Sequence, residues 1–436
     1  MEIKEMVYYS IMNLGIYMII GFPSSYLYFF LQGELHFTLN QDFFRYFLIS
    51  LGSIIGIILA PIFGYLSDKT RSRYGRRRPW IMIFSPICAF LFWLISVPFF
   101  RQEIIGQPGM VFIYIIIIFI IYSIFFNAMA IPYTALMPEV TPENQRIQMS
   151  SLWNVIGGLG TGASIILPAI LLFIVDSYIF VCGILALIFV CSCLITFFKI
   201  NEPERLIPKI HGEGRKGSYM EILKDRKFMI FEIAQFVWNF GFLIILNSIT
   251  AFSVSVFEIK NEFEFGLLGI LLLVILGGFI YIWNIKGDVW GQKKSIMFCL
   301  FFLAIIFPFT IIFSLTPSSV ILIEFPGVIK FIIELPTSTM IPIQIQGIIW
   351  FLFLAVGISG ILILPYSLLM GIVKKGKEAS YMGLNTTFVN LSGASGTLFM
   401  ALFTYFLGAK GAFYYLGPIL AISLFISGLI IRKLEE

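Results

Sequence analysis

Charged residues are scarce in this sequence, and their scarcity excludes an ordinary soluble protein. Of the 436 residues, 12% are charged and 59% are hydrophobic, which is more apolar surface than one soluble core can bury. There are two histidines, and the five cysteines all lie in apolar runs, so neither a metal site nor a disulfide framework is indicated. No histidine pair, serine–lysine dyad or acid pair lies within the long apolar runs. We therefore expect no enzyme, no cofactor and no bound metal.

Long apolar runs are abundant instead, and they predict a polytopic helical membrane protein. Each run has about 20 residues, enough to cross about 30 Å of hydrocarbon. The first run is too long for a signal-peptide core and is interpreted as a retained span. The twelve predicted spans lie near residues 10–30, 45–66, 80–99, 111–137, 150–174, 177–199, 229–256, 265–285, 295–315, 347–371, 381–408 and 411–431.

Basic residues indicate the orientation of these spans. Six cations lie between Lys69 and Arg78, in the loop after the second span, and such clusters stay in the cytoplasm. With twelve spans, both termini are cytoplasmic in a cell membrane. All but five of the 29 Lys and Arg residues then fall inside; those outside are Arg45, Arg101, Lys260, Lys330 and Lys410. Because the cations serve topology, nucleic acid is not an expected partner of this chain of net charge +5.

An internal repeat divides the chain into two halves. The sequence Pro132-Tyr-Thr-Ala-Leu-Met returns as Pro365-Tyr-Ser-Leu-Leu-Met, each near the cytoplasmic end of the fourth span of its half. Asn154 and Asn385 then occupy matching places in the fifth span of each half. We expect an N-terminal six-helix bundle at 1–199, a cytoplasmic linker at 200–228 and a C-terminal six-helix bundle at 229–436.

The segment 316–346 does not fit the repeat. The runs Val320–Phe325 and Val328–Leu335 are rich in β-formers and are joined by Pro326-Gly327, a turn sequence. We predict a small extracellular β-hairpin between spans nine and ten. A re-entrant pair is the alternative, but charged residues and four prolines oppose burial in lipid.

The loop sequence SDKTRSRYGRRRPW, residues 67–80, resembles the loop after span two in the glycoside–pentoside–hexuronide:cation symporters and the related sucrose transporters. Asn127, Pro132-Tyr133, Pro138-Glu139 and Arg146 are similar to the span-four signature of that family and the loop that follows it. The resemblance implies the major facilitator fold, with twelve transmembrane helices in two six-helix bundles, and a sugar or glycoside as the substrate class.

The same resemblance implies a conformational latch on the cytoplasmic side. Asp68 faces a helix N-terminus of the other half, and Arg76 or Arg77 pairs with Glu139. The remaining latch candidates are Arg146 and Asp288, the latter from Asn284-x-x-x-Asp288, which echoes Gly64-x-x-x-Asp68. The alternative is that these cations only set topology.

The charged residues that hold the coupling cation and the sugar in this family are missing here. The positions that match the acids of the cation site are Gly56 and Ala60. Those that match the acids of the sugar site are Tyr17 and Ala130, and Asn154 matches its arginine. Proton or sodium coupling is therefore open. Glu232 and Asp176 are near the spans, and we interpret both as interfacial rather than as a coupling site. A neutral pocket suits an uncharged solute that carries hydroxyl groups.

Amide, hydroxyl and aromatic side chains inside the spans are the candidates for binding such a solute. Asn13, Tyr17 and Ser24 fall within about 40° of arc on one helix. Amides donate and accept hydrogen bonds as sugar hydroxyls require, and Trp153, Trp238 or Trp350 could stack on a sugar ring. The alternative role is hydrogen bonding between helices. The candidates are Asn13, Tyr17, Ser24, Asn127, Asn154, Thr161, Gln235, Trp238, Asn239 and Asn385.

The sequence thus predicts a secondary transporter that works by alternating access, with a sugar or glycoside, membrane lipid and, in the coupled case, a proton or sodium ion as partners. Three alternatives stay open: an uncoupled sugar facilitator, an exporter of amphiphiles or drugs, suggested by 48 phenylalanines, and a sugar sensor that does not transport. The short linker disfavours the sensor. Gly157 to Gly162 lie in an apolar span without a preceding strand, so we expect them to serve close helix packing rather than nucleotide binding.

Overall fold

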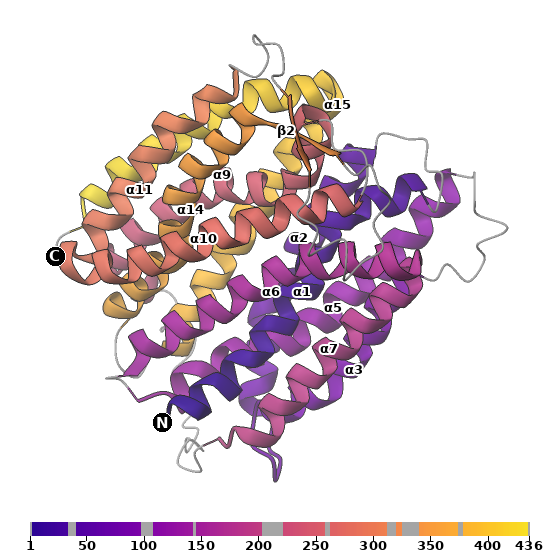
Figure 1. Cartoon of the computed structure of the whole chain (residues 1–436). Helices are drawn as coiled ribbons and strands as arrows, with labels where there is room; N and C mark the ends of the chain where they lie inside the picture. Colours follow the sequence, from indigo (N-terminus) through magenta and orange to yellow (C-terminus); the bar gives the residue numbers. More distant parts are fainter. Residues whose placement is uncertain are drawn as a thin grey trace.

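The computed structural model is an assembly of long, roughly aligned helices (Figure 1). It describes residues 2–33, 41–96, 108–142, 145–202, 221–257, 262–311, 320–324, 340–373 and 378–434. The helices of the first half are α1 (Ile3–Gly33), α2 (Gln41–Lys69), α3 (Arg78–Ile95), α5 (Pro108–Val140), α6 (Arg146–Val175) and α7 (Tyr178–Lys199). Those of the second half are α9 (Arg226–Phe257), α10 (Glu262–Trp290), α11 (Gln292–Ile306), the 3-10 turn η3 (Phe307–Ile311), α14 (Ile345–Ile372) and α15 (Glu378–Arg432).

Among the described residues, eleven helical segments are long and apolar enough to cross a membrane. A further helix, the 29-residue α10, contains a shorter apolar stretch at Val274–Gly287. α15 contains two of the eleven, because Gly408 leaves the helical conformation at φ 71°, a value that glycine adopts readily because it lacks a Cβ. These segments occur in the order of the twelve predicted spans, and the protein is all-helical across the membrane.

The contacts between helices repeat from one half to the other. In the first half α1 packs on α6 and α3 packs on α5, while in the second half α9 packs on α15 and α11 packs on α14. Between the halves, α2 packs on α15 and α10 packs on α6. Exchanging the two halves maps one of these cross-contacts onto the other, as two repeats related by an axis along the membrane normal require. The exact domain boundaries stay a prediction, and most of the linker lies outside the described residues.

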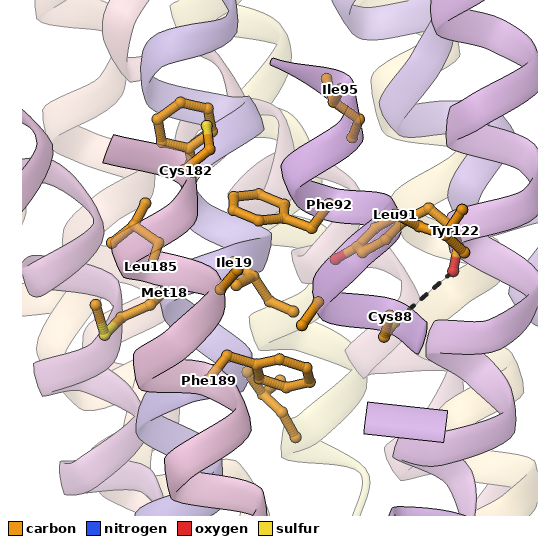
Figure 2. Close-up of a cluster of buried hydrophobic side chains, with 14 of the residues drawn as sticks. Met18, Ile19, Cys88, Leu91, Phe92, Ile95, Tyr122, Cys182, Leu185 and Phe189 are labelled. Carbon is orange, nitrogen blue, oxygen red and sulfur yellow. Dashed lines mark hydrogen bonds between the residues drawn. The ribbon is translucent and has the colours of Figure 1, made fainter. Parts of the chain in front are cut away.

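Each half buries its own hydrophobic core. Figure 2 shows part of the first core, where Met18 and Ile19 of α1 lie beside Phe92 of α3 and Phe189 of α7. Cys88 and Cys182 are buried in this cluster, as expected for cysteines that act as small packing residues. Among the described residues, two buried aromatics cross between the halves: Phe265 of α10 joins the first core and Tyr46 of α2 joins the second.

Glycine allows α1 and α6 to approach closely. A Cβ on Gly160 would lie 2.4 Å from the carbonyl oxygen of Leu14 and 2.9 Å from its Cα. A Cβ on Gly157 would lie 2.5 Å from Asn13 Nδ2. The expectation that these glycines serve helix packing is confirmed at both positions, and the close approach brings the polar side chains of α1 to α6.

A two-stranded antiparallel sheet joins β1 (Val320–Glu324) to β2 (Met340–Gln344), with Ile321 opposite Ile343. β1 lies within the first predicted strand. The second predicted strand, Val328–Leu335, lies outside the described residues, so its pairing stays a prediction, while β1 pairs with β2. β2 is at the opposite end of the molecule from the start of α1 (Figure 1), while its extracellular location remains a prediction.

Candidate functional site

A polar and aromatic cluster lies where α1 meets α6. Asn13 is 1% exposed, and its Nδ2 donates a hydrogen bond of 2.9 Å to the carbonyl oxygen of Trp153. The ring of Tyr17, one turn further along α1, meets the Trp153 ring edge to face, with 6.4 Å between centroids. Asn13 and Tyr17, predicted to share a helix face, thus both contact the same residue of α6.

Trp153 connects the two halves. Its indole Nε1 donates to the hydroxyl of Tyr133 on α5 at 3.2 Å, and its ring stacks on Tyr366 of α14 at 5.6 Å. The hydroxyl of Tyr366 in turn lies 3.7 Å from Met137 Sδ. Tyr133 and Tyr366 are the matching tyrosines of the internal repeat, so the repeat places two equivalent residues on one indole.

Asn154, the next residue of α6, has a buried Nδ2 that finds no hydrogen-bond partner among the described residues. An unpaired buried donor costs about 1–3 kcal/mol, so its presence calls for a function or a missing ligand. Thr161 is different, since its hydroxyl donates to the carbonyl of Gly157 in its own helix at 3.2 Å. Ser24 is buried further along α1.

A second polar contact between the halves surrounds Gly56 of α2. A Cβ there would lie 2.9 Å from Asn390 Nδ2 of α15 and 3.2 Å from Asn127 Oδ1 of α5. The Nδ2 of Asn127 donates to the carbonyl of Ser123 at 2.7 Å, which leaves Oδ1 directed at this junction. Sequence reasoning identified Asn127 but missed Asn390, because a single amide in an apolar span gives no sign of the helix that it will face.

In the second half the predicted residues Gln235 and Asn385 meet a carboxyl group. Asn385 Nδ2 donates to Gln235 Oε1 at 2.5 Å and to Glu232 Oε1 at 3.1 Å. Glu232 is 0% exposed, so protein encloses it, while its position relative to the membrane interface stays a prediction. It lies about 9 Å along α9 from the first residue of the helix, and α15 covers it there. Asp176 is exposed, in the turn between α6 and α7, as expected.

The structure places Trp238 in the hydrophobic core of the second half. It is 1% exposed and meets Phe231 edge to face at 5.8 Å. Asn239 is half-buried on the same helix. Trp350 also has a structural contact, since its Nε1 donates to the carbonyl of Ile306 at 3.3 Å. Of the three tryptophans considered for stacking, Trp153 has the polar surroundings of a solute site.

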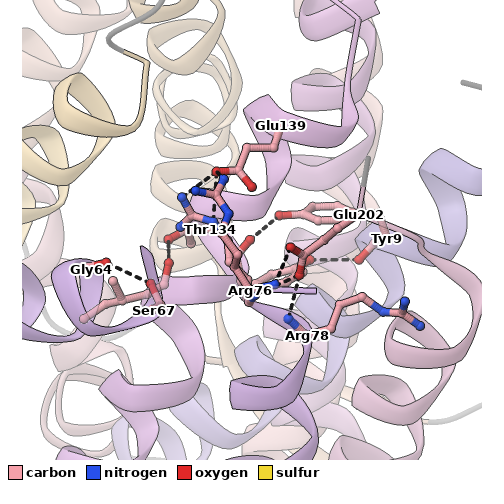
Figure 3. A network of polar contacts seen from close by, with 11 residues as sticks. Tyr9, Gly64, Ser67, Arg76, Arg78, Thr134, Glu139 and Glu202 are labelled. Atoms are coloured by element: carbon pink, nitrogen blue, oxygen red, sulfur yellow. Dashed lines mark hydrogen bonds and ion pairs between the residues drawn. The ribbon is translucent and has the colours of Figure 1, made fainter. Parts of the chain in front are cut away.

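The predicted latch residues Arg76 and Arg77 both contact Glu139 at the end of α5 (Figure 3). Glu139 Oε1 lies 3.0 Å from Arg76 Nη2 and 2.6 Å from Arg77 Nη2. All three residues belong to the first half, so this ion pair fixes the loop within one bundle. The side chains of the other predicted latch residues, Asp68, Arg146 and Asp288, lie outside what the structure describes.

Sequence reasoning missed Glu202, which follows α7. Its carboxylate accepts hydrogen bonds of 2.7–2.8 Å from the backbone N–H groups of Arg76, Arg77 and Arg78 at the start of α3 (Figure 3). These N–H groups have no partner within the helix, and a negative charge is favourable at a helix N-terminus. Gly75, at φ 105°, leaves room for the carboxylate, because a Cβ there would lie 2.5 Å from Glu202 Cδ.

The described part of the chain contains no group of three or more His, Cys, Asp or Glu residues that could hold a metal ion. The polar groups at the centre are instead amides, hydroxyls and indole, on helices of both halves. They suit hydrogen bonding to a neutral polar molecule and offer neither a nucleophile with its base nor a metal centre.

Comparison with solved structures finds the same fold in the human organic anion transporter MFSD10 (TETRAN), with a TM-score of 0.62, 97% of each chain covered and 15% sequence identity. At that identity the likeness shows the fold alone, which is the major facilitator fold. Among curated relatives, the chain is 39% identical over 108 residues to the uncharacterized symporter sll1374 of Synechocystis sp., covering 24% of this chain and 19% of that protein.

Two further relatives have named substrates. The isoprimeverose transporter of Lactiplantibacillus pentosus is 22% identical over 57% of this chain and 52% of its own length. The lactose permease of Lactobacillus helveticus is 26% identical over 32% of this chain and 23% of its own length. The chain therefore spans about half or less of the relatives that it matches.

The family comparison covers much more of the chain. The sequence model described as MFS/sugar transport protein matches residues 9–431, which overlaps every helix described above. The chain is thus a multi-pass membrane protein, a transporter rather than an enzyme, and it belongs to the MFS/sugar transport protein family.

Proposed function

We propose that this protein is a secondary transporter that moves a sugar or glycoside across the membrane by alternating access. The observation that carries the proposal is the cluster of Asn13, Tyr17, Trp153 and Asn154, which is completed by Tyr366 from the other half. A solute bound there contacts both bundles, so their relative movement opens the site to one side at a time. The names of two relatives, a lactose permease and an isoprimeverose transporter, support a saccharide as substrate.

Each group has a defined role in this proposal. The Nδ2 of Asn154, unpaired among the described residues, donates to a solute hydroxyl. The Trp153 ring covers the apolar face of the sugar after Tyr366 moves away from it, as aromatic rings do in sugar sites. Asn13 holds the backbone of Trp153 in place. Asn127 extends the polar surface at Gly56, and Trp238 serves the core.

The proposal places both termini and the loop of Arg76 and Arg77 in the cytoplasm and the β1–β2 sheet outside. The contacts of Arg76 and Arg77 with Glu139 hold that loop to α5, so that Asp68 can engage the other half in one conformation only. Such a contact biases the equilibrium between outward-open and inward-open forms. Accessibility of cysteines introduced at exposed positions of either end tests the topology.

Reconstitution into liposomes tests the function. We expect labelled lactose, isoprimeverose or a related mono- or disaccharide to exchange across the membrane, and Asn154→Ala to weaken its binding about 2- to 12-fold, the equivalent of about 0.5–1.5 kcal/mol for one hydrogen bond. Thr404→Ala is the control, because the Thr404 hydroxyl bonds only to carbonyls of its own helix. Unchanged solute affinity in Asn154→Ala would indicate that Asn154 serves helix packing and not solute binding. Saturable exchange of amphiphiles, with no exchange of saccharides, would favour an exporter.

A further inference from the structure

Glu232 is a fully buried carboxyl group inside a membrane-spanning helix. Its two oxygens lie 3.1 and 3.4 Å from Asn385 Nδ2 of α15. The same nitrogen donates to Gln235 Oε1 at 2.5 Å. Acids in such positions are costly to retain and usually mark ion or proton pathways. The solute site described above does not use this cluster of Glu232, Gln235 and Asn385.

Few hydrogen bonds reach the Glu232 carboxyl group in the described part of the chain. The Asn385 amide has two hydrogens, and three oxygens face it. The described hydrogen bonds to Glu232 come from Asn385 Nδ2 alone, which also donates to Gln235, whereas a well-stabilised carboxylate accepts two or three hydrogen bonds. These contacts stabilise an ionised Glu232 weakly, and protonation removes a costly buried charge. The geometry therefore suits a group that binds and releases a proton.

Positive charge does not replace the missing donors in the described part of the chain. On α9 itself, Arg226 and Lys227 are exposed at the helix start. On α15, the Tyr381 hydroxyl donates to Asp225 Oδ2 at 2.9 Å. On α14, Tyr366 is directed at Trp153 and Met137. On α1, Tyr9 bonds to the carbonyl of Tyr133, and Lys199 of α7 lies over the ring of Tyr8.

We propose that the Glu232–Gln235–Asn385 cluster is a proton-binding site that couples solute movement to the movement of a proton. Asn385 occupies the place in the second half that Asn154 occupies in the first, so the two halves use matching amides for different ligands: Asn154 for the solute, Asn385 for the proton-carrying acid. Helix α9 packs on α1, which bears Asn13 and Tyr17, and this contact links the two sites. This inference rests on the proposed solute transport.

The step itself is a simple protonation. The carboxylate of Glu232 takes a proton from water on one side of the membrane to form an O–H bond, and that bond breaks when the cluster opens to the other side. Sodium fits less well, because it needs several oxygen ligands in place of the nitrogen that both Glu232 oxygens face. A sodium-driven result is therefore an outcome that contradicts the inference.

Transport in liposomes tests coupling. A gradient of about one pH unit corresponds to about 1.4 kcal/mol and supports up to about tenfold accumulation when one proton moves per solute. We expect the unmodified protein to accumulate solute in this way. Glu232→Gln keeps the size of the side chain and a hydrogen-bonding group but cannot titrate, so we expect it to lose accumulation and retain solute exchange. Asp176→Asn is the matched control, at an exposed position where asparagine also tolerates the left-handed backbone of Asp176.

The outcomes separate this inference from the proposed function. Three results would overturn it. Solute accumulation could survive in Glu232→Gln, it could require a sodium gradient, or the unmodified protein could exchange solute without accumulating it under any gradient. If no saccharide is exchanged at all, the proposed function fails. Proton binding by Glu232 is then measured without transport, by infrared difference spectra recorded between two pH values. We expect a carboxylic C=O band in the unmodified protein and in Asp176→Asn that is lost in Glu232→Gln. Absence of the band from the unmodified protein would refute proton binding.

Discussion

Gly160→Ala tests whether the contact between α1 and α6 positions the solute site. The added Cβ would lie 2.4 Å from the carbonyl oxygen of Leu14 and 2.9 Å from its Cα. Because both atoms belong to the backbone, a side-chain rotation cannot relieve the clash, and the helices must separate. Overpacking of this kind costs about 1–3 kcal/mol, while replacement of glycine by alanine in a helix is favourable by about 1 kcal/mol. We expect a net destabilisation of up to about 2 kcal/mol.

The neighbouring glycine provides the control. A Cβ on Gly158 would meet no atom within 4 Å, so Gly158→Ala gains helix propensity and loses nothing. Since the propensity terms are the same in both variants, the difference between their unfolding free energies isolates the clash, about 1–3 kcal/mol. Denaturant unfolding in detergent measures that difference. Solute affinity should fall in Gly160→Ala alone, because Asn13 and Tyr17 move away from Trp153. Equal stability and affinity in the two variants would refute the reasoning.

Three further changes test other parts of the structure. Glu202→Ala removes the acceptor of three N–H groups at the start of α3 and should lower the unfolding free energy by about 1–3 kcal/mol. Glu2→Ala, at an exposed position, should change it little, and equal effects of the two substitutions would contradict the role of Glu202 at the start of α3. Leucine substitutions of Trp153 and Tyr366 in a double-mutant cycle should show a coupling of about 0.5–1.5 kcal/mol, and strict additivity would exclude the stack. Asp68→Asn should slow transport while solute binding persists; an unchanged transport rate would remove Asp68 from the latch.

Features of the fold that depend on local composition could be predicted from the sequence. The length of each apolar run predicts a membrane span, and this prediction does not depend on which helices pack against it. The packing role of Gly157 and Gly160 also follows from the sequence, since small residues in an apolar helix permit close approach. The pairing of β1 with β2 could not be predicted in this way, because β2 begins 16 residues after β1 ends and no short turn sequence joins the two strands.

Burial of single polar residues could not be predicted, because it depends on helices far away in the sequence. Glu232 is six residues from the start of α9, where a carboxyl group can reach water unless another helix covers it. That helix is α15, whose Asn385 is 153 positions away. Glu202 escaped notice for a similar reason, since its partners at Arg76–Arg78 are more than 120 positions away. Neither residue has a local pattern that specifies its partner.

The internal repeat carries information that neither half has alone. Tyr133 and Tyr366 are equivalent in sequence, and the approximate twofold relation of the halves should give them equivalent surroundings. Instead both contact Trp153, a residue of the first half whose counterpart in the second, beside Asn385, is Leu384. The stack is therefore one-sided: Tyr366 crosses between halves while Tyr133 stays within its own. The contact between Tyr366 and Trp153 can separate while each hydrophobic core stays intact. Movement of two stable bundles around a central solute requires contacts that separate in this way.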